Sequence, residues 1–100
     1  MQKDVTTSWG KLDHGRMLVT ENPLPIATDF KCEVGVTVRA ATGNSGKIYV
    51  GNSDMTKDTA YATDGYELAA GQTIFIPVNN TKSVYIVGSV NPQQAYWIAV

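Results

Sequence analysis

The fold is set out most clearly by residues 33–51, which read EVGVTVRAATGNSGKIYVG. The first half alternates apolar with small or polar residues, and a period of two places the apolar residues on one face of a β-strand. The glycines and the asparagine of residues 42–46 tolerate positive φ and therefore predict a reversal of the chain. Residues 47–51 follow as a second strand, so the stretch predicts a hairpin with one face turned to a core. The residues assigned to that face are Val34, Val36, Val38, Ala40, Ile48 and Val50.

The same kind of pattern continues to the end of the chain. Residues 66–72 predict a short extended piece closed by a glycine turn, and residues 73–78 predict a strand that lies at an edge or ends at Pro77, which cannot donate a ladder hydrogen bond. Residues 83–89 are apolar on both faces and predict a central strand, while the apolar residues 95–100 predict a last strand docked inside a sheet. Roughly five or six short strands without a helical segment predict an all-β fold, a small antiparallel β-sandwich or barrel.

The N-terminal third of the sequence differs from the rest. Residues 1–32 carry large apolar side chains at no helical or strand period, and Pro23 and Pro25 interrupt any continuous element. We therefore expect an extended N-terminal arm over residues 1–32 and a β-sandwich domain over residues 33–100. The arm either folds back on its own sandwich or reaches a neighbouring subunit. If it reaches a neighbour, deletion of residues 1–20 leaves the strands folded but weakens self-association or binding to a partner.

Composition excludes several classes of partner. One hundred residues make one domain, and a net charge of −1 from 8 basic and 9 acidic residues leaves no clustered basic face for nucleic acid. No apolar run is long enough to cross a bilayer, and the N-terminus lacks the apolar stretch of a secretory signal, so we expect no membrane partner and synthesis in the cytosol. Cys32 is the single cysteine, so it forms no internal disulfide, and we expect it to be a small buried filler.

The sequence offers no recognisable catalytic or metal-binding constellation. His14, the only histidine, lies between Asp13 and a glycine and is expected in a solvated turn. Asp54, Asp58 and Asp64 fall on one polar stretch, but their spacing does not match a calcium loop. We therefore expect no enzymatic activity, no cofactor, no metal and no small-molecule substrate.

Large side chains outside the predicted core are candidates for contact with other proteins. A sandwich of this size is close to the break-even point of stability, which favours support from further copies or from a partner. Tyr and Trp are favoured at interfaces, although Tyr49, Tyr85 and Trp97 are expected to pack against the sheets. The residues predicted to bind partners are Trp9, Leu12, Met17, Leu18, Tyr61 and Tyr66.

Several motifs of the sequence resemble a known group of proteins. They are GVTVRAA at 35–41, NSGKIYVGNS at 44–53, GYELAAGQ at 65–72, VYIV at 84–87 and YWIAV at 96–100. Together they cover about two thirds of the chain, and in this order they resemble small virion proteins of tailed bacteriophages. That group includes capsid decoration or cement proteins and head-fibre or tail-associated components.

The resemblance implies a non-enzymatic structural protein that is made in the host cytoplasm and resides in the virion. Its first expectation is a capsid decoration protein, often a homo-oligomer, that binds the major capsid protein, other virion proteins or neighbouring subunits. A head-fibre, neck or tail-associated component is an alternative within the same group. Another alternative is a carbohydrate- or receptor-binding β-domain that uses Tyr61, Tyr66 and Trp97 as stacking platforms.

Overall fold

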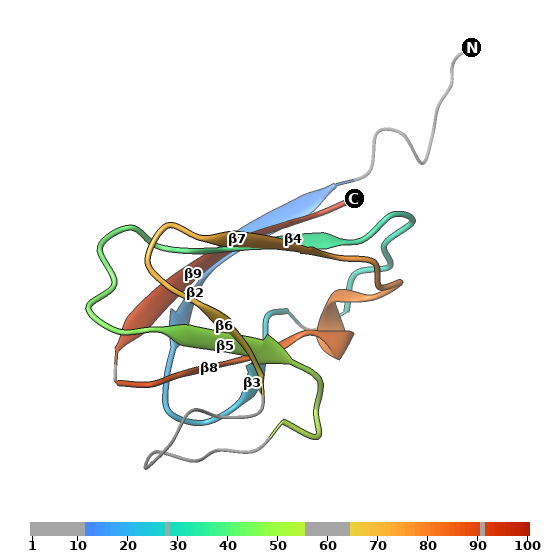
Figure 1. Cartoon of the computed structure of the whole chain (residues 1–100). Coiled ribbons are helices and arrows are strands. Elements are labelled where there is room, and N and C mark those ends of the chain that lie inside the picture. The colour runs from blue at the N-terminus through green and yellow to red at the C-terminus, as the bar shows by residue number, and fades with distance from the viewer. Residues whose placement is uncertain (1–11, 28, 56–64, 91) are drawn as a thin grey trace.

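Two antiparallel β-sheets pack face to face in the computed structural model, which describes residues 12–27, 29–55, 65–90 and 92–100 (Figure 1). The first sheet has the order β2-β9-β4-β7, with β2 (Asp13–Val19), β9 (Gln93–Ala99), β4 (Val36–Ala40) and β7 (Thr73–Ile76). The second has the order β3-β8-β5-β6, with β3 (Leu24–Pro25), β8 (Tyr85–Gly88), β5 (Ile48–Gly51) and β6 (Tyr66–Leu68). A 3-10 turn, η2 (Thr81–Ser83), precedes β8. The sheets are not closed into a barrel, so the predicted all-β class is confirmed as a small β-sandwich.

The main core lies between the two sheets. Alternate residues of every long strand point into it, because successive side chains of a strand face opposite sides of the sheet. Cys32 is buried at its margin, as predicted, and burial raises the pKa of its thiol. Members of this core include Val19, Val36, Val38, Ile48, Val50, Leu68, Ile86, Ala95, Trp97 and Ala99.

Three predictions about individual strands are confirmed. β7 is an edge strand and ends at Ile76, directly before Pro77. β8 lies inside the second sheet and is covered on both sides, with Ile86 in the main core and Val87 in a smaller cluster beside Tyr49. β9 lies between β2 and β4, which explains the apolar end of the chain.

The predicted hairpin of residues 33–51 is wrong, because β4 and β5 belong to different sheets. The connection between them instead crosses from one sheet to the other and is held by side-chain amides. The Asn44 side chain donates to the backbone oxygen of Gln94 at 2.9 Å and accepts from its N–H at 2.8 Å. The buried Gln93 side chain accepts from the N–H of Gly46 at 2.9 Å. These hydrogen bonds tie the connection to residues 93–94, and no hairpin ladder forms between β4 and β5.

The predicted arm is also wrong for its described part, since residues 13–19 form β2 and pair with β9 along its whole length. Val19 is fully buried, and β3 adds a short piece of the same N-terminal region to the second sheet. The domain boundary at residue 32 therefore does not separate structural units within the described chain. His14 lies in β2 and is exposed; the expected turn is absent there.

The start of β4 is fixed by a close contact between backbones at Gly35. Val34, assigned to the core, is 58% exposed, because the strand begins only at Val36. The backbone oxygen of Val100 accepts hydrogen bonds from the N–H groups of Glu33, Val34 and Gly35 at 3.1, 2.8 and 3.1 Å. Gly35 has φ +155°, and a Cβ added there would lie 2.3 Å from the backbone oxygen of Ile76. Only glycine fits this position without displacing the backbone.

Gly35→Ala is expected to lower the free energy of unfolding by about 2 kcal/mol or more, because the methyl group meets backbone in a conformation that L-residues avoid. Urea denaturation followed by circular dichroism measures the effect. Gly43→Ala is the matched control, since an added Cβ there meets nothing within 4 Å, and it should change stability by no more than about 0.5 kcal/mol. Equal stability of the two variants would contradict the backbone contact at Gly35.

Candidate functional site

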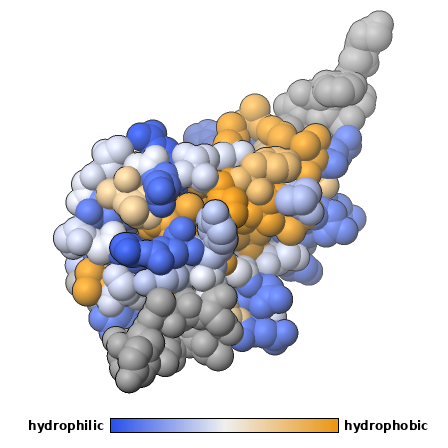
Figure 2. Space-filling model, in the orientation of Figure 1, coloured by the Kyte–Doolittle hydropathy of each residue, from blue (hydrophilic) through white to orange (hydrophobic). Residues whose placement is uncertain are grey.

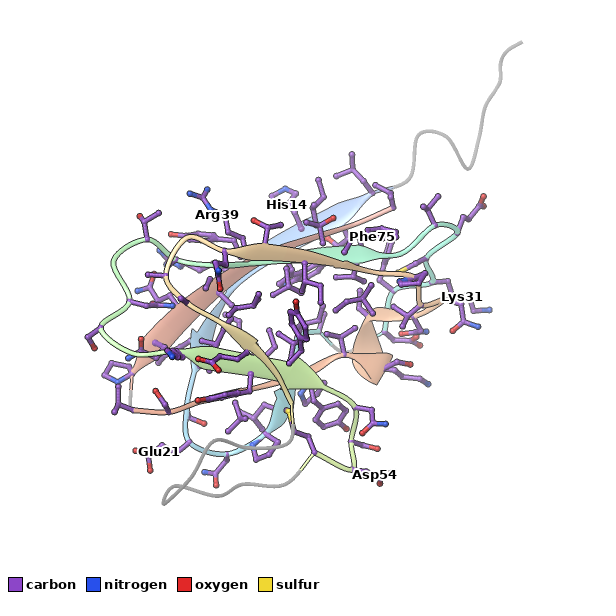
Figure 3. The ribbon with its side chains drawn as sticks, viewed as in Figure 1. His14, Glu21, Lys31, Arg39, Asp54 and Phe75 are labelled. Atoms are coloured by element: carbon purple, nitrogen blue, oxygen red, sulfur yellow. The ribbon has the colours of Figure 1, made fainter. Side chains whose placement is uncertain are left out.

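The side of the β2-β9-β4-β7 sheet that faces away from the core carries an unusual set of side chains. Two cross-strand rows run over it in register. One row contains His14, Ile98, Thr37 and Phe75, and the other contains Arg16, Tyr96, Arg39 and Thr73. Leu12, Leu18 and Val100 extend it at the strand ends. These eleven residues are called the outer face below, and Figure 3 shows His14, Arg39 and Phe75 pointing away from the second sheet on the same side.

The outer face is rich in exposed apolar side chains. Ten large apolar residues are exposed in the described chain, and six of them belong to the outer face, each between 40% and 60% exposed. Figure 2 shows apolar surface gathered over the part of the molecule where the C-terminal end of the chain lies. The six are Leu12, Leu18, Phe75, Tyr96, Ile98 and Val100. A sheet that buries one face and leaves such residues on the other has a second surface suited to packing.

The charged side chains of the outer face are both positive. Arg16 and Arg39 lie on either side of Tyr96 in the same row, and both are exposed. Neither arginine has an ion-pair partner among the described residues. The one carboxylate at the edge, Asp13, accepts a hydrogen bond from the N–H of His14 at 3.0 Å. The outer face therefore presents two guanidinium groups beside apolar surface, with no ionic partner among the residues that the structure describes.

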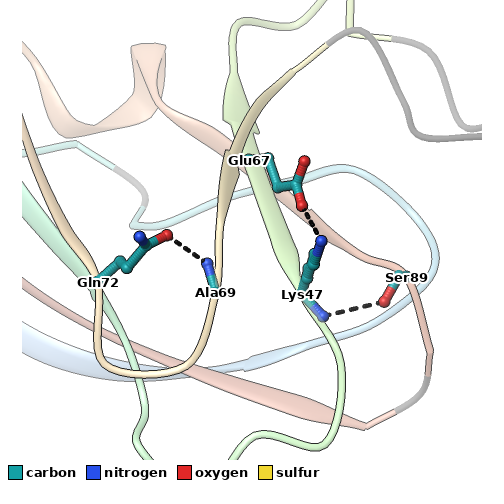
Figure 4. A network of polar contacts seen from close by, with 5 residues as sticks. All are labelled: Lys47, Glu67, Ala69, Gln72 and Ser89. Atoms are coloured by element: carbon teal, nitrogen blue, oxygen red, sulfur yellow. Dashed lines mark hydrogen bonds and ion pairs between the residues drawn. The ribbon is translucent and has the colours of Figure 1, made fainter.

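Several polar groups around β5 and β6, in the other sheet, pair with one another (Figure 4). Lys47 forms an ion pair with Glu67, and the hydrogen bond to this carboxylate, together with its charge, raises the pKa of Lys47. The N–H of Lys47 donates to Oγ of Ser89 at 3.0 Å, and the N–H of Ala69 donates to Oε1 of Gln72 at 2.8 Å. The Lys47 charge is therefore paired, whereas Arg16 and Arg39 of the outer face have no ion-pair partner in the described part of the chain.

Two hollows accompany these surfaces. The first, of about 610 Å³, lies where the outer face meets the 42–45 loop and is lined by polar groups beside Leu18, Arg39 and Tyr96. The second, of about 270 Å³, is apolar and lies where the sandwich opens between β6 and β7, with Tyr66 on its lining. The first hollow continues the outer face, whereas the second lies on a different side of the molecule.

The residues predicted to bind partners are not all brought together. Leu12 and Leu18 lie on the outer face, but Met17 is half-buried against the core and is not available to a partner, because adjacent residues of a strand face opposite ways. Tyr66 is exposed but belongs to β6 in the other sheet. Trp9 and Tyr61 lie outside the described residues.

Trp97 packs as predicted and is only 8% exposed, which removes it as a stacking platform. The prediction missed Arg16, Arg39, Phe75 and Tyr96. The alternation of residues 93–99 carried the missing signal, since Tyr96 has the opposite phase to Trp97.

In the described part of the chain, no three His, Cys, Asp or Glu side chains come together as metal ligands would. Asp54 is exposed, and the other two aspartates of its stretch, Asp58 and Asp64, fall outside the described residues. None of the described helical segments has the length and apolar character that a membrane crossing requires. No family model, curated protein or solved structure matches this chain.

Proposed function

We propose that this chain is a non-enzymatic structural protein of a bacteriophage particle, namely a capsid decoration protein that docks on the shell through its outer face. The observation that carries the proposal is the outer face, on the side of the β2-β9-β4-β7 sheet that faces away from the core. Its exposed apolar side chains lie beside Arg16 and Arg39. The phage assignment rests on the motifs at 35–41, 44–53 and 65–72, which resemble those of small virion proteins. Residence in the virion and contact with the major capsid protein belong to the same proposal.

The geometry suits docking for two physical reasons. Contiguous exposed apolar patches on soluble proteins mark interaction sites, because such surface gains free energy when it leaves water. The outer face is also held on four hydrogen-bonded strands, so little backbone freedom is lost when a partner binds. A decoration protein needs only a modest contact per copy, since it binds a repeating shell at many equivalent positions.

A carbohydrate- or receptor-binding role is the second candidate, and the polar hollow at the end of the outer face favours it. The hollow brings Tyr96 beside Arg39 and Asn44, and an aromatic ring next to hydrogen-bonding groups is a common way to hold a sugar. A glycan array probed with the labelled protein tests this role. Binding there that Tyr96→Ala abolishes would favour the second candidate over decoration.

The decoration proposal is tested by counting copies in purified particles. Quantitative mass spectrometry of particles from the phage that encodes this chain should find copies in a fixed ratio to the major capsid protein. Particles made without the gene serve as the control, and added purified protein should restore the same ratio. A handful of copies per particle would place the protein in a neck, tail or fibre, and none at all would refute a virion role.

A further inference from the structure

We propose that the outer face takes a protein surface whose apolar side chains are flanked by carboxylates, and that a second copy of this chain is not its occupant. This inference rests on the proposed docking role of the outer face and adds the chemistry of the partner. It is carried by the arrangement of Arg16, Tyr96 and Arg39 in one cross-strand row.

The row has a geometry that suits acidic groups on either side of an apolar contact. Arg16 and Arg39 are the direct neighbours of Tyr96 on β2 and β4. At ordinary strand spacing their Cα atoms lie about 10 Å apart, with Tyr96 between them. A guanidinium group presents N–H donors in a fixed fork that matches a carboxylate. The next row places Ile98 and Phe75 beside it as the apolar part of the contact.

Charge complementarity excludes packing between two identical outer faces. Such a pair would bring four guanidinium groups into one interface, because none of the eleven side chains of the outer face is acidic. Like charges placed together at an interface suppress association. The partner must therefore supply the opposite charge.

The area of the outer face also argues against a second copy of this chain as its occupant. Two strands of seven residues, one of five and one of four cover roughly 360 Å² at ordinary strand spacing. Two such faces would bury roughly 700 Å², which is below the 1,200 Å² or so at which specific stable interfaces begin. A larger partner surface can also contact the loops around the sheet, among them the polar hollow beside Arg39.

The direct test is charge reversal on the outer face. Arg16→Glu/Arg39→Glu is compared with Lys31→Glu/Lys82→Glu, which makes the same change in net charge at two exposed positions, Lys82 within η2 and Lys31 opposite Asn80. Binding to particles that lack the protein is measured by sedimentation at low and high salt. We expect the arginine variant to bind about tenfold more weakly or worse, the lysine control to bind within about twofold of wild type, and wild-type binding to weaken as salt rises. Equal loss in both variants, or none in the arginine variant, would overturn the inference.

A second measurement keeps the inference separate from the proposed function, since it needs no particles. The probe is 8-anilinonaphthalene-1-sulfonate, whose rings bind apolar surface and whose sulfonate pairs with a cation. Its addition should shift the amide resonances of Arg39, Tyr96 and Ile98 in the wild type and leave them unshifted in the arginine variant. Dye binding there, with no particle binding by the wild type, would refute the decoration role and support the chemistry of the face.

The remaining outcomes go against the inference. Dye-induced shifts confined to β5 or β8 would overturn it, whatever the particles do. A wild-type dimer in analytical ultracentrifugation whose formation Phe75→Ala abolishes would make a second copy the occupant, and this too would overturn it.

Discussion

A protein that lacks residues 1–20 is expected to be unfolded, because the deletion removes the whole of β2. β2 pairs with β9 over seven residues and supplies Val19, which is fully buried in the core. Burial of one such side chain stabilises a fold by about 1.5–3 kcal/mol, and the deletion also removes the sheet surface under Trp97. Since small domains are stable by only about 5–15 kcal/mol in total, the loss of an entire strand leaves little stability.

The matched control is deletion of residues 1–11, which leaves every described strand in place. Both deletions remove Trp9, so the fluorescence of each truncated protein comes from Trp97 alone. We expect buried-type emission and a cooperative thermal transition in the shorter deletion. In the longer deletion we expect the emission seen in denaturant and no transition. Cooperative melting of the protein without residues 1–20 would show that β2 is dispensable, as the arm hypothesis holds.

The arm hypothesis was wrong because β2 does not display its pattern in the sequence. Its inward positions include Asp13 and Gly15, which are not apolar, while Leu18 points to solvent. The glycine is explained only by the partner strand, because an added Cβ at residue 15 would lie 3.0 Å from the indole of Trp97. A strand whose packing depends on a residue 82 positions away cannot be recognised from its own alternation.

Strands with their own alternation were predicted well. Residues 36–40 place apolar side chains at every second position, and the structure buries those positions. The last strand was predicted from the apolar residues 95–100, and the structure confirms it as β9, which already begins at Gln93. The connection at 42–46 was predicted as a reversal, but its turn residues do not specify the strand that follows as a partner. The choice between a hairpin and a crossing depends on the amide bonds of Asn44 and Gln93 to distant groups.

The candidate site could be predicted only in part for a related reason. Leu12 and Leu18 were identified as large apolar residues without a local partner, and they do lie on the outer face. The arginines that flank Tyr96 come from β2 and β4, which are brought to the same sheet only by their shared pairing with β9. The order of the strands in the sheet therefore creates the site, and this order cannot be predicted from any single segment of the sequence.

Trp97→Ala is expected to lower the free energy of unfolding by about 3–5 kcal/mol, the usual cost of truncating a buried Trp. Trp97 is 8% exposed, and its indole fills the space above Gly15 on the neighbouring strand. Its removal leaves a cavity that the glycine cannot fill, so little of the lost packing is recovered. Urea denaturation followed by circular dichroism measures the change, because the mutation removes the buried fluorophore.

Ile98→Ala is the matched control, since it changes the next residue of the same strand on the opposite face. Ile98 is 42% exposed, so its truncation should cost no more than about 1 kcal/mol while it weakens binding to particles. The two variants are expected to separate the roles of the two faces of β9, stability for Trp97 and docking for Ile98. A smaller stability loss in Trp97→Ala than in Ile98→Ala would contradict this orientation of β9. It would show that the indole, and not Ile98, lies at the docking surface.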